Sequence, residues 1–282
     1  MTKDISVLDS WLADRPYLKE VAGLQQTIDN LLGNVPSKQI PPFHWDSLSE
    51  DFKDGIPFLR KRNLDETVVA PAAELFALLA RELPGYEIPE EMKRISSSLN
   101  DILGGEPGLA ASLIREASAG SESKPLGDGS IPPGALRFLA WRSLERVLRP
   151  WVATLDGWLQ EATWGKPYCP LCASKPTMTQ LVNTDKGRQK FLSCGCCRSR
   201  WGYLRTSCPF CGNHDQDKLD IFEIPQEENF RIDLCRECNG YIKTYISEGD
   251  EDLFLADWST LHLDVIARQQ GFKRMANSLY EL

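Results

Sequence analysis

The sequence predicts an α+β protein with an N-terminal all-α helical domain, two tandem β lobes and a C-terminal helix. Three observations predict this class. Apolar residues recur at helical spacing through much of the first 165 residues. All nine cysteines lie between Cys169 and Cys238, among short segments that are typical of strands. Helical spacing returns after Gly249. The predicted boundaries are 1–165 for the helical domain, 166–207 and 208–250 for the lobes, and 251–282 for the C-terminal helix.

The strongest helical segment spans residues 64–83, in which Pro71 suits the start of a helix. Two shorter helices are predicted at 90–103 and 107–118, separated by Gly104–Gly105. The apolar residues of the first segment share one broad face, which consists of Leu75, Phe76, Leu78 and Leu79.

Residues 119–134 are rich in Gly, Ser and Pro, so we expect an exposed loop or a boundary there. Residues 135–164 return to helical spacing, and Pro150 is expected to kink or interrupt that helix. Four tryptophans accompany this segment, and packing in a helical core is favoured for them over an aromatic binding surface. They are Trp141, Trp151, Trp158 and Trp164.

The two lobes are predicted from strand-like segments that flank turns. Residues 177–184 and 188–194 form one hairpin, and residues 219–225 and 229–235 form a second. Residues 241–246 add another short strand. The C-terminal helix is expected within 258–275, with Ser259 as N-cap, Gly271 near its end, and one apolar side made of Leu261, Val265 and Ile266.

Eight of the cysteines form four C-x-x-C pairs, a spacing that lets one tight turn direct two sulfurs at the same point. The first two pairs are separated by 21 residues and the last two by 23, enough for a hairpin, whereas only ten residues separate the middle pairs. Sequential pairing therefore predicts two tetrathiolate metal sites, which suit zinc or a rubredoxin-type iron. The first site is Cys169, Cys172, Cys194 and Cys197, and the second is Cys208, Cys211, Cys235 and Cys238.

Four thiolates close a coordination shell, so both sites are expected to be structural, or one-electron redox sites if the metal is iron. A thioredoxin-like redox pair is the less favoured alternative because it requires a helix N-terminus in a βαβ setting. Disulfides are disfavoured by the cytosolic location that we expect. Cys196 lies inside the second pair and is expected to be a bystander, and His214 is not expected to be a ligand.

Bulk composition bounds the function. With 42% apolar and 26% charged residues the chain is typical of a globular protein, and its net charge of −8 argues against general affinity for nucleic acid. No apolar stretch is long enough to span a bilayer, and the N-terminus does not resemble a secretory signal. We therefore expect a cytoplasmic protein without membrane insertion. No phosphate-binding glycine loop, nucleophile elbow or acid–base pair is present, so an enzyme is not predicted.

Charge is unevenly divided between the lobes. Residues 166–207 carry eight Lys/Arg and one acid, whereas residues 208–250 carry four Lys/Arg and ten acids. Mutual attraction of the lobes is the simpler interpretation, and a bipolar surface for a charged protein segment is the functional one.

The cysteine region resembles the formate dehydrogenase accessory proteins of the FdhE type. The resemblance extends from Tyr168 to Arg274 and rests on the four C-x-x-C pairs, Trp201, the segment 238–243 and the segment 261–264. It implies a helical N-terminal region, two rubredoxin-like metal sites, and a cytoplasmic assembly factor that contacts the catalytic subunit of a respiratory formate dehydrogenase before export. Cys196 departs from the pattern without disturbing the ligand spacing.

Two other functions remain open at this point. An iron tetrathiolate pair could transfer single electrons. A zinc-ribbon nucleic-acid-binding protein could use a basic strip in the first lobe together with Phe191 and Trp201. The cations of that strip are Lys186, Arg188, Lys190, Arg198, Arg200 and Arg205.

Overall fold

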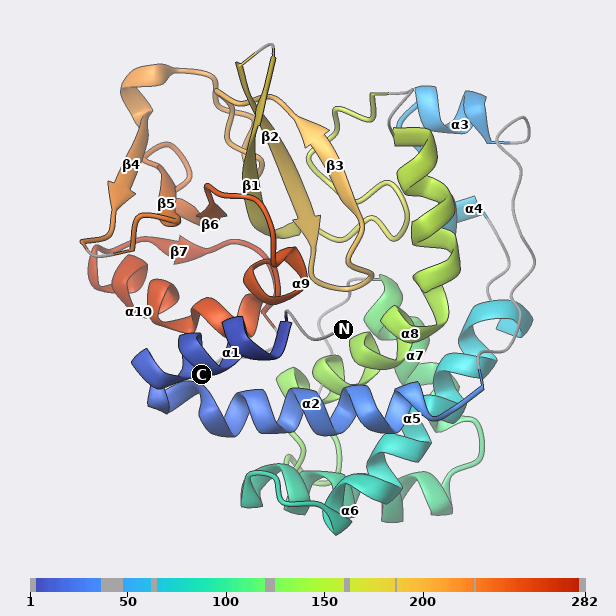
Figure 1. Cartoon of the computed structure of the whole chain (residues 1–282). Helices are drawn as coiled ribbons and strands as arrows, with labels where there is room; N and C mark the ends of the chain where they lie inside the picture. Colours follow the sequence, from blue (N-terminus) through green and yellow to red (C-terminus); the bar gives the residue numbers. More distant parts are fainter. Residues whose placement is uncertain are drawn as a thin grey trace. The chain divides into compact units, whose positions relative to one another are not determined.

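The computed structural model describes residues 4–36, 48–61, 65–119, 125–159, 163–185, 187–225 and 227–278 (Figure 1). Lys186 lies outside the described residues. The chain forms two compact units: Met1–Phe43 with Lys61–Val152 and Leu282 make the first, and His44–Arg60 with Ala153–Glu281 make the second. The α+β class is confirmed, because a helical region is followed by a mixed β-sheet with a C-terminal helix. The predicted division of residues 166–250 into two lobes stays a prediction.

The first unit is built from helices, several of which bury one apolar side. Short 3-10 turns follow α1 and α5, at Pro16–Leu18 and Leu83–Gly85, and a π turn at Asp65–Val69 precedes α5. The main helices are α1 (Asp4–Asp14), α2 (Lys19–Gly33), α5 (Ala70–Glu82), α6 (Glu90–Gly105), α7 (Leu109–Ala119) and α8 (Pro133–Leu159), the last of which ends in the second unit.

The predicted start and face of α5 are confirmed in the main. Pro71 lies in the first turn, where its missing N–H has no helical acceptor to lose. Leu75, Phe76 and Leu79 are buried, whereas Leu78 is half-buried. Gly105 ends α6, as the Gly-Gly break predicts.

Two expectations for the region after α7 hold only in part. Helix α8 is not interrupted at Pro150, and buried Leu148 and Trp151 on either side help to offset the cost of the proline, about 3 kcal/mol. The stretch before α8 is not simply exposed, since Ile131 is fully buried and pairs with Leu126 in a β-bridge. Trp141 and Trp151 are buried in the core, as expected.

The second unit contains a seven-stranded mixed sheet in the order β3-β2-β1-β6-β5-β4, with β7 paired to β6. Both predicted hairpins, β1–β2 and β4–β5, are present, while β3 and β7 were not predicted. Parallel pairing of Met178–Gln180 with Lys243–Tyr245 joins the two hairpins into one sheet. The strands are β1 (Pro176–Thr184), β2 (Gly187–Cys194), β3 (Arg200–Tyr203), β4 (Leu219–Glu223), β5 (Phe230–Cys235), β6 (Gly240–Tyr245) and β7 (Lys273–Arg274).

The C-terminal helix differs in detail from the prediction. After the short helix α9 (Glu251–Phe254) and a 3-10 turn at Asp257–Thr260, α10 (Leu261–Gln269) begins two residues after Ser259, whose hydroxyl instead donates to the carbonyl of Leu253 at 2.8 Å. The predicted apolar side is wrong, since Val265 is 47% exposed. The residues of α10 that are buried are Leu263, Asp264 and Ala267.

A segment from early in the chain belongs to the second unit. It carries α3 (Ser49–Lys53) and α4 (Phe58–Lys61). The amides of Phe58 and Leu59 donate to the carbonyls of Pro170 and Leu171, both at 2.9 Å. The first C-x-x-C turn is therefore held from outside by backbone hydrogen bonds from a segment more than a hundred residues away in sequence.

Candidate metal centres

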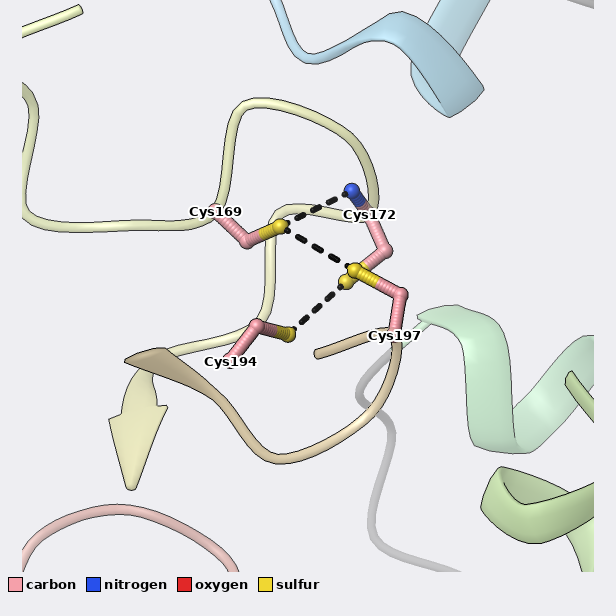
Figure 2. A group of neighbouring side chains, drawn as sticks. All are labelled: Cys169, Cys172, Cys194 and Cys197. Atoms are coloured by element: carbon pink, nitrogen blue, oxygen red, sulfur yellow. Dashed lines mark hydrogen bonds between the residues drawn. The ribbon is translucent and has the colours of Figure 1, made fainter. Parts of the chain in front are cut away.

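The first four predicted ligands converge on one point (Figure 2). Cys169 and Cys172 come from the turn before β1, Cys194 ends β2, and Cys197 precedes β3. Sulfur–sulfur distances are 3.5 Å from Cys169 to Cys197 and 3.4 Å from Cys172 to Cys194. Because β1 and β2 pair directly, the hairpin brings its two flanking turns together.

The other four predicted ligands form a second cluster of the same kind. The Sγ atoms of Cys208 and Cys238 lie 3.8 Å apart, and those of Cys211 and Cys235 lie 3.7 Å apart. The hairpin β4–β5 and the following turn supply the last pair.

The separations fit a tetrahedral thiolate site. A metal–sulfur bond of about 2.3 Å requires sulfur–sulfur edges of about 3.8 Å, whereas a disulfide requires about 2.05 Å. In each cluster all four sulfurs lie within 4.8 Å of one another, and all eight thiols are free. Each cluster can therefore hold one ion through four thiolates, and zinc and iron suit this donor set equally.

One backbone conformation repeats in the four turns. The residue after the second cysteine of each pair has a left-handed conformation, with φ between 56° and 73°. In three turns its amide donates to the carbonyl of the first cysteine, at 3.0 to 3.2 Å. Only Gly212 among these residues adopts this φ without steric cost, so the turns are maintained by the sulfurs and hydrogen bonds around them. The four residues are Ala173, Arg198, Gly212 and Asn239.

Serine hydroxyls surround the first cluster. The Ser199 hydroxyl is fully buried and lies 3.0 Å from the sulfur of Cys169 and 3.2 Å from that of Cys197. The Ser174 hydroxyl lies 3.3 Å from the sulfur of Cys172. The Ser199 hydroxyl can donate to both thiolates and orient them toward an ion, whereas the Cys172 thiol donates to the Ser174 hydroxyl. These serines were not predicted as part of the site, although each lies two residues after a predicted ligand.

Several of the clustered thiols have a raised pKa without a metal, whereas the pKa of Cys172 and of Cys235 is lowered. Burial raises the pKa of Cys194 and of Cys197, and neighbouring thiols raise both further. Burial likewise raises the pKa of Cys208 to about 11. Metal binding at either cluster must therefore displace protons, so affinity falls as pH decreases.

The two clusters differ in their access to solvent. All four cysteines of the first are at most 3% exposed. In the second, Cys211 is exposed and Cys238 is half-buried. A small chelator can therefore reach the second site directly, whereas the first site must open first.

Cys196 is buried but is not one of the four clustered ligands. Its thiol is among the neighbours that lower the pKa of Cys172, after that of Cys169 and Cys194, so it lies close to the first site. Cys196 therefore lies beside the ligand set and not within it.

A buried charge cluster connects the sheet to α10 and was not predicted. Lys243 of β6 is fully buried, and its ammonium lies 2.6 Å from Asp257 Oδ1 and 2.8 Å from Asp264 Oδ2. Arg274 pairs with both carboxylates, and the Tyr241 hydroxyl donates to Asp264 at 2.7 Å. Two cations and two anions therefore balance in the interior, which explains why α10 turns an aspartate inward.

The predicted basic strip for nucleic acid does not form one surface. Strand register places Lys190 and Arg200 on opposite faces of the sheet. Trp201 is fully buried, and its indole donates to the carbonyl of Lys166 at 2.9 Å. Arg198 donates to the carbonyl of Leu255. A continuous strip of cations and stacking aromatics is therefore not available among these residues.

Sequence comparison relates the chain to curated FdhE homologs. The FdhE homolog of Aquifex aeolicus is 32% identical over 148 residues, which cover 51% of this chain and 52% of that protein. The homolog of Stutzerimonas stutzeri is 27% identical over 281 residues, which cover 96% of this chain and 84% of that protein. The chain is therefore similar to FdhE homologs along nearly its whole length. No protein-family profile matches it.

The family fold is also represented by a solved structure. The crystal structure of the FdhE protein from Pseudomonas aeruginosa superposes with a TM-score of 0.62 at 23% identity, covering 94% of this chain and 88% of that one. At that identity the likeness shows the fold. The match with the Aquifex relative spans about half the length of that protein. None of the helices in the described ranges has both the length and the apolar composition needed to cross a membrane.

The segments on which the family resemblance rested now have a structural role. Tyr241 and Lys243 from the segment after Cys238, and Asp264 from the segment 261–264, meet in the buried charge cluster. Both segments therefore attach the C-terminal helix to the sheet that carries the cysteine turns.

Proposed function

We propose that this FdhE homolog is an accessory protein for a respiratory formate dehydrogenase, acting in the cytoplasm as a metal-stabilised adaptor on the catalytic subunit before export. The similarity to an FdhE homolog, which extends along 96% of the chain, carries the proposal. The net charge of −8 suits a protein-binding adaptor better than a nucleic-acid-binding one.

A non-catalytic role is supported by the chemistry of the two clusters. The residues that would hold the ions are the eight clustered cysteines, and four thiolates leave an ion no open position for substrate. When bound, a zinc or iron ion at each site contributes folding free energy, on the order of 10 kcal/mol. The cysteine turns and the sheet between them would thus form a rigid platform for a partner.

Anaerobic pull-down with the catalytic subunit tests the proposal. We expect the metal-loaded chain to retain the subunit, and a Cys172→Ser variant, which removes one ligand of the sealed first site, to retain less of it. Failure of the metal-loaded wild type to retain the subunit would overturn the proposed function.

One observation favours a second candidate, a rubredoxin-like one-electron redox protein. Cys211 is exposed, so electrons could leave an iron ion at the second site without crossing a thick protein layer. Visible absorption from a ferric thiolate centre in anaerobically purified protein would support this function, and a colourless protein with two zinc ions would exclude it.

A further inference from the structure

A cleft of about 380 Å³ lies in the second unit beside the second cysteine cluster. Its walls come from β1, β2, β4, β5, β6 and the turn at Cys208. The volume is within the range of ligand-binding pockets, about 300–1,000 Å³. Strand register assigns the cleft to the face of the sheet that carries Leu181, Lys190, Asp233 and Ile242, opposite the face on which Lys243 reaches α10.

Positive charge predominates in the cleft. Two carboxylates, Asp220 and Asp233, also line it, but each is already paired. Asp220 accepts from Arg236 at 2.6 Å, and Asp233 lies 2.8 Å from the Nε of Arg231. The four cationic residues of the lining, which outnumber its two carboxylates, are Arg188, Lys190, Arg205 and Arg231; Cys208 and Cys235, also in the lining, would add negative charge as metal-bound thiolates.

Lys190 is the residue that points most directly to a ligand. It is 5% exposed, and its ammonium lies 3.6 Å from Asp233 Oδ2, too far for a strong hydrogen bond. Within the described part of the chain it makes an ion pair but no hydrogen bond. The ammonium therefore has donors available to an acceptor oxygen supplied from the cleft.

The remaining wall is apolar. Leu181, Ile242 and Phe210 line the cleft, and Ile221, also in the lining, is 49% exposed. A small inorganic anion would contact the cations and leave this surface in water, whereas a peptide with an acidic and an apolar side chain would contact both.

We propose that this cleft binds an acidic peptide segment of the partner protein, with an Asp or Glu carboxylate on Lys190 and Arg231 and a neighbouring apolar side chain on Leu181 and Ile242. The assignment rests on the proposed function, since the partner is the formate dehydrogenase catalytic subunit. The cleft would recognise that subunit by a carboxylate flanked by an apolar side chain.

Binding of the purified catalytic subunit to metal-loaded variants tests the assignment. Lys190→Met removes the buried donor, and Arg205→Glu reverses an exposed charge at the rim without touching the interior. We expect each to weaken binding about tenfold or more, as for loss of a charged hydrogen bond. Lys273→Glu, a charge reversal on an exposed lysine outside the cleft, is the matched control and should bind like wild type.

The outcomes separate the two proposals. If the wild type does not bind the subunit, the proposed function fails and the cleft assignment fails with it. If the wild type binds the subunit and both cleft variants bind it as tightly as the wild type does, only the cleft assignment is overturned.

A tiled array of 15-residue peptides from the subunit gives an independent readout. Retained peptides should contain Asp or Glu and lose binding when these become Asn or Gln, while retention of basic or neutral peptides alone would overturn the assignment. Self-association abolished by the same cleft variants would assign the cleft to a second copy of this chain instead.

Discussion

Replacement of Lys243 by methionine is the most informative perturbation of the second unit. Lys243→Met keeps the length and apolar stem of the side chain but removes a cation that is fully buried between two carboxylates. Among the described residues, Asp257 and Asp264 then keep Arg274 as their cationic partner, and the interior acquires one uncompensated negative charge.

The contact distances determine how much the free energy of unfolding should fall. At an effective dielectric constant of about 20, a unit-charge pair at about 2.7 Å attracts by roughly 6 kcal/mol, and desolvation of the ions removes several kcal/mol of that. Removal of one partner leaves the desolvation cost without its compensation. We therefore expect Lys243→Met to lower the free energy of unfolding by about 3–5 kcal/mol.

Urea denaturation at saturating metal, followed by far-UV circular dichroism, measures this change. Lys218→Met is the matched control, because Lys218 pairs with Glu237 at the surface and should leave the denaturation midpoint unchanged. Combining Lys243→Met with Asp264→Leu should restore part of the loss, since the remaining Asp257–Arg274 pair is neutral. A Lys243→Met midpoint equal to that of the control would refute a buried, charge-balanced cluster.

Four further outcomes follow from the geometry. A chromophoric chelator should remove the ions in two phases, the faster from the exposed second site, and a single phase would contradict the difference in burial. Ser199→Ala should lower metal affinity at the first site about 10–100-fold in chelator competition and leave the second site unchanged. Gly240→Ala should destabilise the second site by about 1–3 kcal/mol, because its Cβ would lie 2.5 Å from Met275 Cγ, whereas Gly202→Ala meets no atom within 4 Å and should be tolerated. Burial alone would raise the pKa of Asp257, but Arg274 and Lys243 hold that pKa below its usual value. The ionised Asp257 carboxylate therefore stabilises the folded state above a pH of about 3.9, and this stabilisation is lost as the pH falls further. Unfolding free energies measured from pH 6 to 3 should therefore fall less steeply for Asp257→Asn than for wild type.

Local chemistry explains why the ligand groups could be anticipated. The C-x-x-C spacing determines which sulfurs share a turn, and a hairpin of about twenty residues returns the chain to the starting edge. The strands β1, β2, β4, β5 and β6 follow from alternation and turn residues alone. Strands β3 and β7 were missed because each is short, four and two residues, and is defined by its pairing with a neighbour.

The failures share one cause. An apolar periodicity rule assigned Val265 to the buried side of α10, but the inward side contains Asp264. Its carboxylate is accommodated because it forms ion pairs with Lys243 and Arg274. Similarly, a helix rule predicted a kink or an interruption at Pro150, and the helix is not interrupted where buried neighbours lie on both sides. In each case a tertiary contact outweighs a local preference.

By itself the sequence determined the α+β class, the eight clustered sulfurs and their division into two sets, because spacing within a turn and a hairpin is a local property. Only the tertiary structure decided that β1 and β6 join the two hairpins into one sheet, that the segment around Phe58 and Leu59 supports the first cysteine turn, and that one cluster is sealed while the other reaches solvent. These features depend on contacts between residues some sixty to more than a hundred positions apart. A pattern read along the sequence does not specify which distant surfaces pack against one another.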